Sequence, residues 1–194
     1  MANHLEQIRA QLEESCRVKQ SFSRELLERI SEFAERSAAA LAAGNKLVWF
    51  GNGGSAADAI HLAAEFVVRL RGDRPSLPAL ALAANPSVLT AAGNDYGFES
   101  IFARQIESLV ARGDVLVALS TSGTSPNILR GVNAGRRRGA WLVALTGETG
   151  GQLRDKVDLL LNVPSRDSQR IQEAHITIGH IVTSLVEQNL FKKQ

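Results

Sequence analysis

Residues 46–58, KLVWFGNGGSAAD, pass from an apolar run through a glycine-rich turn into an alanine-rich helical pattern. The run is apolar from Leu47 to Phe50, as is typical of strands buried on both faces. Three glycines and Asn52 follow, and these residue types turn a chain tightly. A buried strand, a tight turn and a helix in this order indicate the first unit of an α/β fold.

The same pattern is repeated along the chain. Four more short apolar runs occur, at 78–84, 114–120, 141–145 and 158–163. Segments of helical length and period separate them, at 55–71, 86–92 with 98–112, and 125–138. The segment after Pro164 has the pattern of a closing helix. Alternating strands and helices predict a three-layer α/β/α fold around a central parallel five-stranded sheet.

Two helices are predicted ahead of the first strand. Apolar residues recur at helical spacing over residues 5–42, with a break near Ser21. A chain of 194 residues fits one domain of ordinary size. We therefore expect a single domain over 1–194, with N-terminal helices in 1–43 and the α/β core in 44–194.

Composition and charge argue against nucleic-acid and membrane partners. The formal net charge of +2 is too small for a nucleic-acid surface, and the run Arg136–Arg138 before Gly139 is interpreted as a solvated helix end. No apolar run reaches the ~18 residues of a membrane span and no signal peptide is recognised, so we expect a cytoplasmic protein. The single cysteine, Cys16, is expected to be a small packing residue.

The glycine-rich turn is the first candidate binding loop. Asn52, Gly53 and Gly54 can direct successive N–H groups toward one point. Ser55 and Asp58 have the S-x-x-D spacing of a helix cap. A tight turn followed by a good cap explains this stretch equally well. The stretch lacks the patterns of a Walker loop and of a dinucleotide-binding loop.

A second loop, STSGTSP at 120–126, favours binding of an anion. Gly123 is surrounded by five hydroxyl residues: Ser120, Thr121, Ser122, Thr124 and Ser125. Pro126 suits the first turn of a helix whose N-cap would be Ser125. Hydroxyl groups at a helix N-terminus can hold a phosphate dianion without a lysine, although a serine-rich turn without a ligand is the alternative.

Two helices carry candidate acid–base residues. The helix after the first loop has a polar stripe: Asp58, His61, Glu65 and Arg69. A solvent-facing stripe with a His61–Glu65 pair at i,i+4 spacing explains these residues as well. The closing helix carries Gln172, Glu173, His175 and His180. Gln172 and His180 lie about 80° apart around a helix, so both can face one cleft, whereas His175 is interpreted as a core residue.

Five separated motifs resemble one family in order and spacing. They are GNGGSAAD, AGNDYGF, STSGTSPN, LTGETGG and RIQEAHI. The chain resembles SIS-domain proteins, which have a flavodoxin-like fold, and more closely the phosphoheptose isomerase family. The resemblance runs from about Gly44 to the carboxyl terminus, and the N-terminal helices are similar in length.

The resemblance implies a role for each matching residue. The phosphate would be held by Ser120, Thr121, Ser122 and Ser125. The sugar chain would be lined by Asn52, Gly53, Gly54, Ser55, Asn94, Asp95 and Gln172. The catalytic pair would be Glu65, which transfers the proton between C1 and C2, and His180, which serves the oxygens. The stretch 83–87 departs from the polar sequence of many relatives, and Asp167 is only a candidate sugar contact.

Some members of the family bind zinc, which implies one Zn²⁺ held by His61, Glu65, Gln172 and His180. Imidazole and carboxylate groups are ordinary zinc ligands, and a metal would polarise the carbonyl. Glu65 cannot at once be fully committed to zinc and act as a free base. Either Glu65 shifts during turnover, or one of its two roles is wrong.

The implied activity converts sedoheptulose 7-phosphate into D-glycero-D-manno-heptose 7-phosphate through an enediol, for lipopolysaccharide or capsule heptose. The resemblance also implies a homotetramer with active sites between subunits, assembled through the N-terminal helices. A non-catalytic SIS protein that binds the replication initiator is the main alternative, and loss of the acid–base residues would favour it. An isomerase acting on arabinose 5-phosphate usually carries extra regulatory domains, for which this chain has no room.

Overall fold

The protein is described by a computed structural model that covers residues 3–191. Its centre is a parallel five-stranded sheet in the order β2-β1-β3-β4-β5. The strands are β1 (Leu47–Gly51), β2 (Ala79–Ala81), β3 (Val115–Ser120), β4 (Trp141–Thr146) and β5 (Leu159–Asn162). This order is that of flavodoxin-like sheets, and the five predicted strands are confirmed. The edge strand β2 is shorter than its apolar run.

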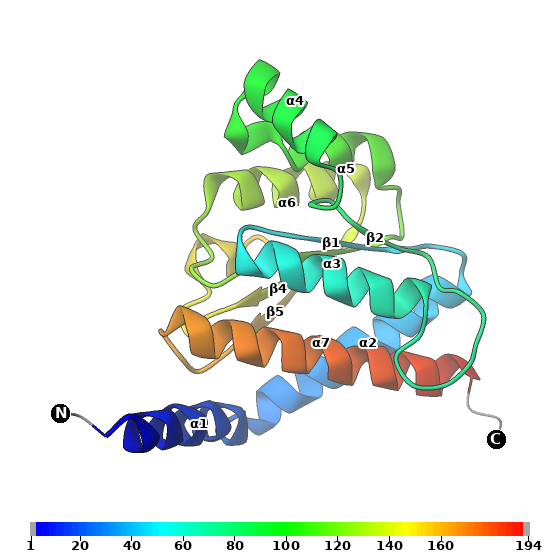
Figure 1. Ribbon diagram of the computed structural model, residues 1–194. Coiled ribbons are helices and arrows are strands. Elements are labelled where there is room, and N and C mark those ends of the chain that lie inside the picture. The colour runs from blue at the N-terminus through cyan, green and yellow to red at the C-terminus, as the bar shows by residue number, and fades with distance from the viewer. Residues whose placement is uncertain (1–2, 192–194) are drawn as a thin grey trace.

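Helices cover both faces of the sheet, as predicted (Figure 1). The helices are α1 (His4–Gln20), α2 (Arg24–Ala42), α3 (Gly54–Val67), α4 (Pro86–Tyr96), α5 (Ala103–Leu109), α6 (Pro126–Arg138) and α7 (Ser168–Phe191). A short 3₁₀ helix, η1 (Phe98–Ser100), lies between α4 and α5, and another, η2 (Gly151–Leu153), lies between β4 and β5. The core is divided between a cluster under α2, α3 and α7 and another under α4, α5 and α6.

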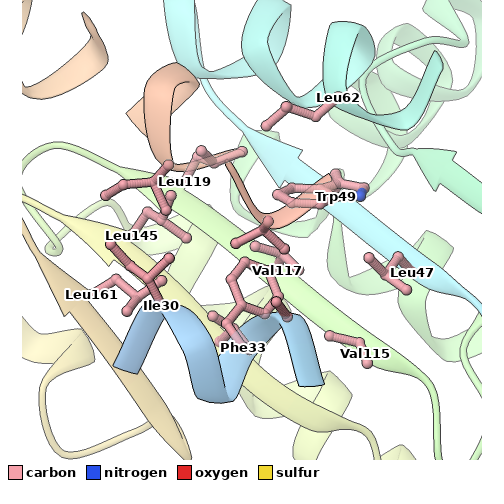
Figure 2. Packing of buried hydrophobic residues seen from close by; sticks show 14 of the residues in the cluster. Ile30, Phe33, Leu47, Trp49, Leu62, Val115, Val117, Leu119, Leu145 and Leu161 are labelled. Carbon is pink, nitrogen blue, oxygen red and sulfur yellow. The ribbon is translucent and has the colours of Figure 1, made fainter. Parts of the chain in front are cut away.

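Successive strand residues point into opposite clusters, because side chains alternate across a strand. Leu47 and Trp49 of β1 belong to the cluster under α3 and α7, and Val48 and Phe50 belong to the other. Figure 2 shows Trp49 between Leu62 of α3 and the side chains of the central strands. A strand with both faces covered must be apolar throughout, which explains the apolar run in β1.

The two N-terminal helices precede the first strand, as predicted. The amphipathic α2 packs against α7, while α1 leaves an apolar stripe exposed at Leu5, Ile8 and Leu12. Cys16 lies on the exposed side of α1, so the expectation that it is a packing residue is wrong. Among residues 3–191, no helix is long and apolar enough to cross a membrane.

The turns of the two candidate loops differ in part from expectation. Helix α3 begins at Gly54, and its N-cap is Gly53, which has a φ of 54° and no capping side chain. The predicted Ser55 cap is therefore wrong, because the glycine turn already starts the helix and Ser55 is buried behind it. Ser125 is the N-cap of α6 with Pro126 in the first turn, as predicted, although its side chain makes no capping hydrogen bond.

Candidate active site

The two candidate loops are held side by side at the carboxyl edge of the sheet. They follow the neighbouring strands β1 and β3, between which the strand order reverses direction. Open parallel sheets bind ligands at this point. Asn52 and Asn127 exchange two side-chain hydrogen bonds of 2.9 and 2.8 Å. A Cβ at Gly51 would meet Leu119 O at 2.9 Å, so only glycine allows this approach.

The hydroxyl loop at 120–125 is arranged to donate hydrogen bonds. Ser120 Oγ accepts the N–H of Gly123 at 3.2 Å, and Ser122 Oγ accepts the N–H of Thr124 at 3.3 Å. Because these oxygens act as acceptors within the loop, their own protons remain available for a ligand. Thr121 and Ser122 form one wall of a pocket of about 200 Å³. This geometry suits a phosphate group.

Helices α3 and α7 run in the same direction, in contact at two glycines. Gly54, at the start of α3, lies against the amide of Gln172, which a Cβ would meet at 2.8 Å. Seven residues farther along α7, Gly179 lies against Leu62. The pairs are spaced almost equally on both helices, so the polar stripe of α3 faces that of α7.

His61, Glu65 and His180 meet at this helix contact. The Nε2 atoms of His61 and His180 are 2.8 Å apart, and His61 Nε2 is 3.5 Å from Glu65 Oε1. The two imidazole rings are nearly perpendicular, at 82°. One histidine must donate and the other accept at this distance. The side chain of His61 is 48% exposed, so the cluster is open to solvent and ligands.

Asp58 completes the polar stripe from a more buried position. Its Oδ2 has no hydrogen-bond partner among residues 3–191. Burial raises the pKa of the Asp58 carboxyl, against the opposing charges of His61 and His180. Asp58 therefore belongs to the electrostatic surroundings of the histidine pair, which agrees with its predicted place in the polar stripe of this helix.

The chemistry of the cluster fits a zinc ion. Single ligand atoms of His61, Glu65 and His180 lie within 4.8 Å of one another. Ligands of tetrahedral zinc, at ~2.0–2.1 Å from the metal, lie about 3.3 Å from one another. The His61–Glu65 distance of 3.5 Å is close to this value. The two imidazoles, at 2.8 Å, would have to separate slightly to share a metal.

The glycine-rich turn and the cluster lie at different points along α3, and the hydroxyl loop lies beside that turn. Gly54 and His61 are seven residues apart, which corresponds to about 10 Å along a helix. A phosphate at the loop and a carbonyl at the cluster must therefore be separated by an extended carbon chain. The arrangement suits a sugar phosphate that reacts at the end remote from its phosphate.

Three other predicted residues lie apart from this arrangement. Asn94 donates to Asp95 at 2.7 Å on α4, in the opposite helical layer (Figure 1). Asp95 lines a separate pocket of about 630 Å³ with Tyr96 and Arg104. Asp167 accepts the N–H of Gln169 at 2.8 Å near the start of α7. The contacts described for residues 3–191 do not join these side chains to the cluster.

His175 is a core residue, as predicted. It is fully buried, and burial lowers the pKa of its imidazole to about 4. Its Nε2 lies 3.2 Å from Thr146 O, so a neutral ring can donate there. His175 therefore lies outside the cluster although it is only five residues from His180.

Comparison with known proteins identifies the class first. The SIS domain family matches residues 12–147, which contain both candidate loops and α3. The solved phosphoheptose isomerase from Francisella tularensis superposes with a TM-score of 0.92 at 34% identity, covering 96% of this chain and 99% of that chain. The chain is thus a SIS-domain protein.

Closer relatives identify the particular family. A phosphoheptose isomerase from Geobacter sulfurreducens is 53% identical over 187 residues, covering 96% of this chain and 99% of that protein. The solved phosphoheptose isomerase from Neisseria gonorrhoeae has a TM-score of 0.90 at 40% identity, covering 96% of this chain and all of that chain. The chain belongs to the phosphoheptose isomerase family and is an enzyme of that class.

Proposed function

We propose that the protein converts sedoheptulose 7-phosphate into D-glycero-D-manno-heptose 7-phosphate. The observation that carries this proposal is the meeting of His61, Glu65 and His180 about two helical turns from the glycine-rich turn, which lies beside the hydroxyl loop. Membership of the phosphoheptose isomerase family supports it.

The proposed mechanism begins with the phosphate at Ser120, Thr121, Ser122 and Ser125. The sugar chain extends past Asn52, Gly53, Gly54, Ser55 and Gln172 toward the cluster. Glu65 removes the proton from C1 while His180 donates a proton to the C2 carbonyl oxygen, which gives the enediol. Glu65 then returns its proton to C2, and His180 takes the proton from the C1 hydroxyl, so the protein ends in its starting protonation state.

We also propose that the protein holds one Zn²⁺ ion. The ligands would be His61, Glu65, Gln172 and His180. When bound, the ion would polarise the carbonyl and stabilise negative charge on its oxygen. Gln172 packs against Gly54 at the start of α3, so the amide also fits a role in holding the sugar chain. The proton transfers assigned to Glu65 require its carboxylate to be free for part of the cycle.

We further propose a cytoplasmic homotetramer that supplies heptose for lipopolysaccharide or capsule. The exposed apolar stripe Leu5, Ile8 and Leu12 on α1 supports assembly through the N-terminal helices. Asn94 and Asp95 lie apart from the cluster of their own chain. An active site shared between subunits would explain how they reach a substrate.

The decisive experiment is the conversion of sedoheptulose 7-phosphate by the purified protein, before and after chelation and with zinc added back. Turnover that is lost on chelation and restored by zinc supports both the activity and the metal. Turnover that chelation leaves unchanged argues for the metal-free pair Glu65 and His180. Absence of turnover even with zinc would contradict the proposal and favour a binding protein.

A further inference from the structure

Helix α3 ends two residues after Glu65, and a buried arginine from the following loop binds that end. Arg74 donates from Nη2 to Glu65 O at 2.8 Å and from Nη1 to Phe66 O at 2.9 Å. These backbone oxygens belong to the last turn of α3, where helix carbonyls have no partner within the helix. The side chain of Arg74 is only 2% exposed, so water does not replace these bonds.

Glu187 of α7 holds Arg74 in place. Its Oε1 accepts the Arg74 Nε–H at 2.8 Å and the N–H of Leu70 at 2.9 Å. Burial alone would raise the pKa of the Glu187 carboxyl, but the Leu70 N–H and the Arg74 guanidinium outweigh it and lower the pKa. Glu187 is therefore an ionised anchor on α7 whose Oε1 accepts both hydrogen bonds, and removal of either partner would leave a buried charge uncompensated.

This pair links the end of α3 to α7. The two helices also touch at Gly54 with Gln172, at Leu62 with Gly179 and at the histidine pair. Glu187 lies seven residues, about two helical turns, beyond His180, so it lies near the same face of α7. The cluster of His61, Glu65 and His180 is thus bracketed by the glycine contact on one side and by the arginine on the other.

We propose that Arg74, anchored by Glu187, is a positioning residue that fixes Glu65 relative to His61 and His180. It acts through the backbone carbonyl of Glu65 and touches neither the substrate nor the reacting atoms. The inference rests on the proposed function, because it assigns a purpose to the placement of Glu65. The sequence offers no sign of it, since Arg74 and Glu187 are separated by 113 residues.

The test compares Arg74→Lys, Arg74→Ala and Glu187→Gln with a matched buried ion pair elsewhere. Lysine keeps the charge but cannot donate to two carbonyls and a carboxylate in one plane. The control is Asp114→Asn: Asp114 is 1% exposed, binds Lys46 at 2.6 Å and lies just before β3, where it contacts neither α3 nor α7 in the hydrogen bonds described for residues 3–191. All variants are first compared by thermal unfolding.

We expect Arg74→Lys to lower kcat for sedoheptulose 7-phosphate about 10- to 100-fold, since small misplacements of reacting groups have effects of this size. KM should stay within about twofold, because the hydroxyl loop is untouched. Added guanidinium ion should restore part of the kcat of Arg74→Ala. Asp114→Asn should lose stability with a normal kcat. If Arg74→Lys and Glu187→Gln both keep the wild-type kcat, the inference is overturned.

A second readout separates this inference from the proposed function. The imidazole NMR resonances of His61 and His180 in the zinc-free protein should shift in Arg74→Lys and not in Asp114→Asn. If the wild-type protein does not turn over sedoheptulose 7-phosphate, the proposed function fails. The histidine resonances alone then test whether Arg74 positions Glu65. Unshifted resonances in Arg74→Lys would then refute the positioning role.

Discussion

Gly179 of α7 lies against Leu62 of α3 so closely that no side chain fits between them. A Cβ placed on Gly179 falls 3.0 Å from Leu62 Cγ and closer to both methyl groups of that leucine. Leu62 is fully buried and adjoins His61, so the two helices can meet at the histidine pair only because position 179 has no side chain.

The Gly179→Ala variant tests this contact. The added methyl group should force α3 and α7 apart and lower the free energy of unfolding by about 1–3 kcal/mol, as overpacking does. The larger separation of His61 and His180 should also lower kcat. Gly93→Ala on α4 is the matched control, because its Cβ would meet only Ile101, at 3.8 Å. We expect that control to be neutral or up to about 1 kcal/mol more stable by denaturant unfolding. Equal stability of the two variants would contradict the argument.

Glu65→Gln and His180→Gln test the proposed proton transfers. Each removes one acid–base group, and kcat should fall by about 10²–10⁴-fold with little change in KM. Steady-state kinetics with sedoheptulose 7-phosphate gives both constants. Glu32→Gln is the control, because Glu32 forms an exposed i,i+4 pair with Arg36 on α2. Near-normal turnover of Glu65→Gln would show that another group moves the proton.

The double variant Ser120→Ala with Ser122→Ala tests the phosphate site. Each hydroxyl lost should remove a hydrogen bond to a charged group, worth about 1.5–3 kcal/mol, so KM should rise at least tenfold. The loop itself also loses the acceptors for the Gly123 and Thr124 N–H groups. Ser108→Ala, at an exposed position on α5, is the control. An unchanged KM in the double variant would place the phosphate elsewhere.

Because His175 is buried as a neutral ring, we expect the free energy of unfolding to fall in acid. The pKa of its imidazole is about 4 in the folded protein, compared with its ordinary value of 6.5 in an unfolded chain. The unfolded chain therefore binds more protons between these values, and stability falls as the pH falls from about 7 to 4. The difference in pKa corresponds to a loss of about 3 kcal/mol.

Urea unfolding at several pH values measures this loss. In His175→Gln, whose amide can still donate to Thr146 O, the free energy of unfolding should depend less on pH. His4→Gln, at an exposed position of α1, should keep the wild-type dependence. A His175→Gln curve parallel to that of the wild type would refute the assignment.

The sheet could be predicted from the sequence because its strands are buried on both faces. A run such as Leu47 to Phe50 has no polar position, and five such runs alternate with helices. The spacing of Gln172 and His180 likewise predicted a shared face of α7, since both residues contact α3. These are local periodicities, which a sequence carries directly.

The contacts between distant elements could not be predicted in this way. Nothing local indicates that Gly179 faces Leu62 or that Arg74 reaches the end of α3. The Ser55 cap failed for a local reason, because the positive φ of Gly53 allows the chain to start the helix two residues earlier. The assigned roles of the cluster residues stay predictions until the variants are measured.

The common direction of α3, α6 and α7 determines which way round a substrate can lie. All three begin at the carboxyl edge of the sheet, and Ser168 of α7 lines the same pocket as Thr121 and Ser122. Their dipoles therefore present three positive poles to the proposed phosphate site, each worth about 0.3–1 kcal/mol to an anion. The reverse orientation would bring a dianion beside the carboxylate of Glu65. The fold thus distinguishes the two ends of a sugar phosphate before any hydroxyl group of the sugar is recognised.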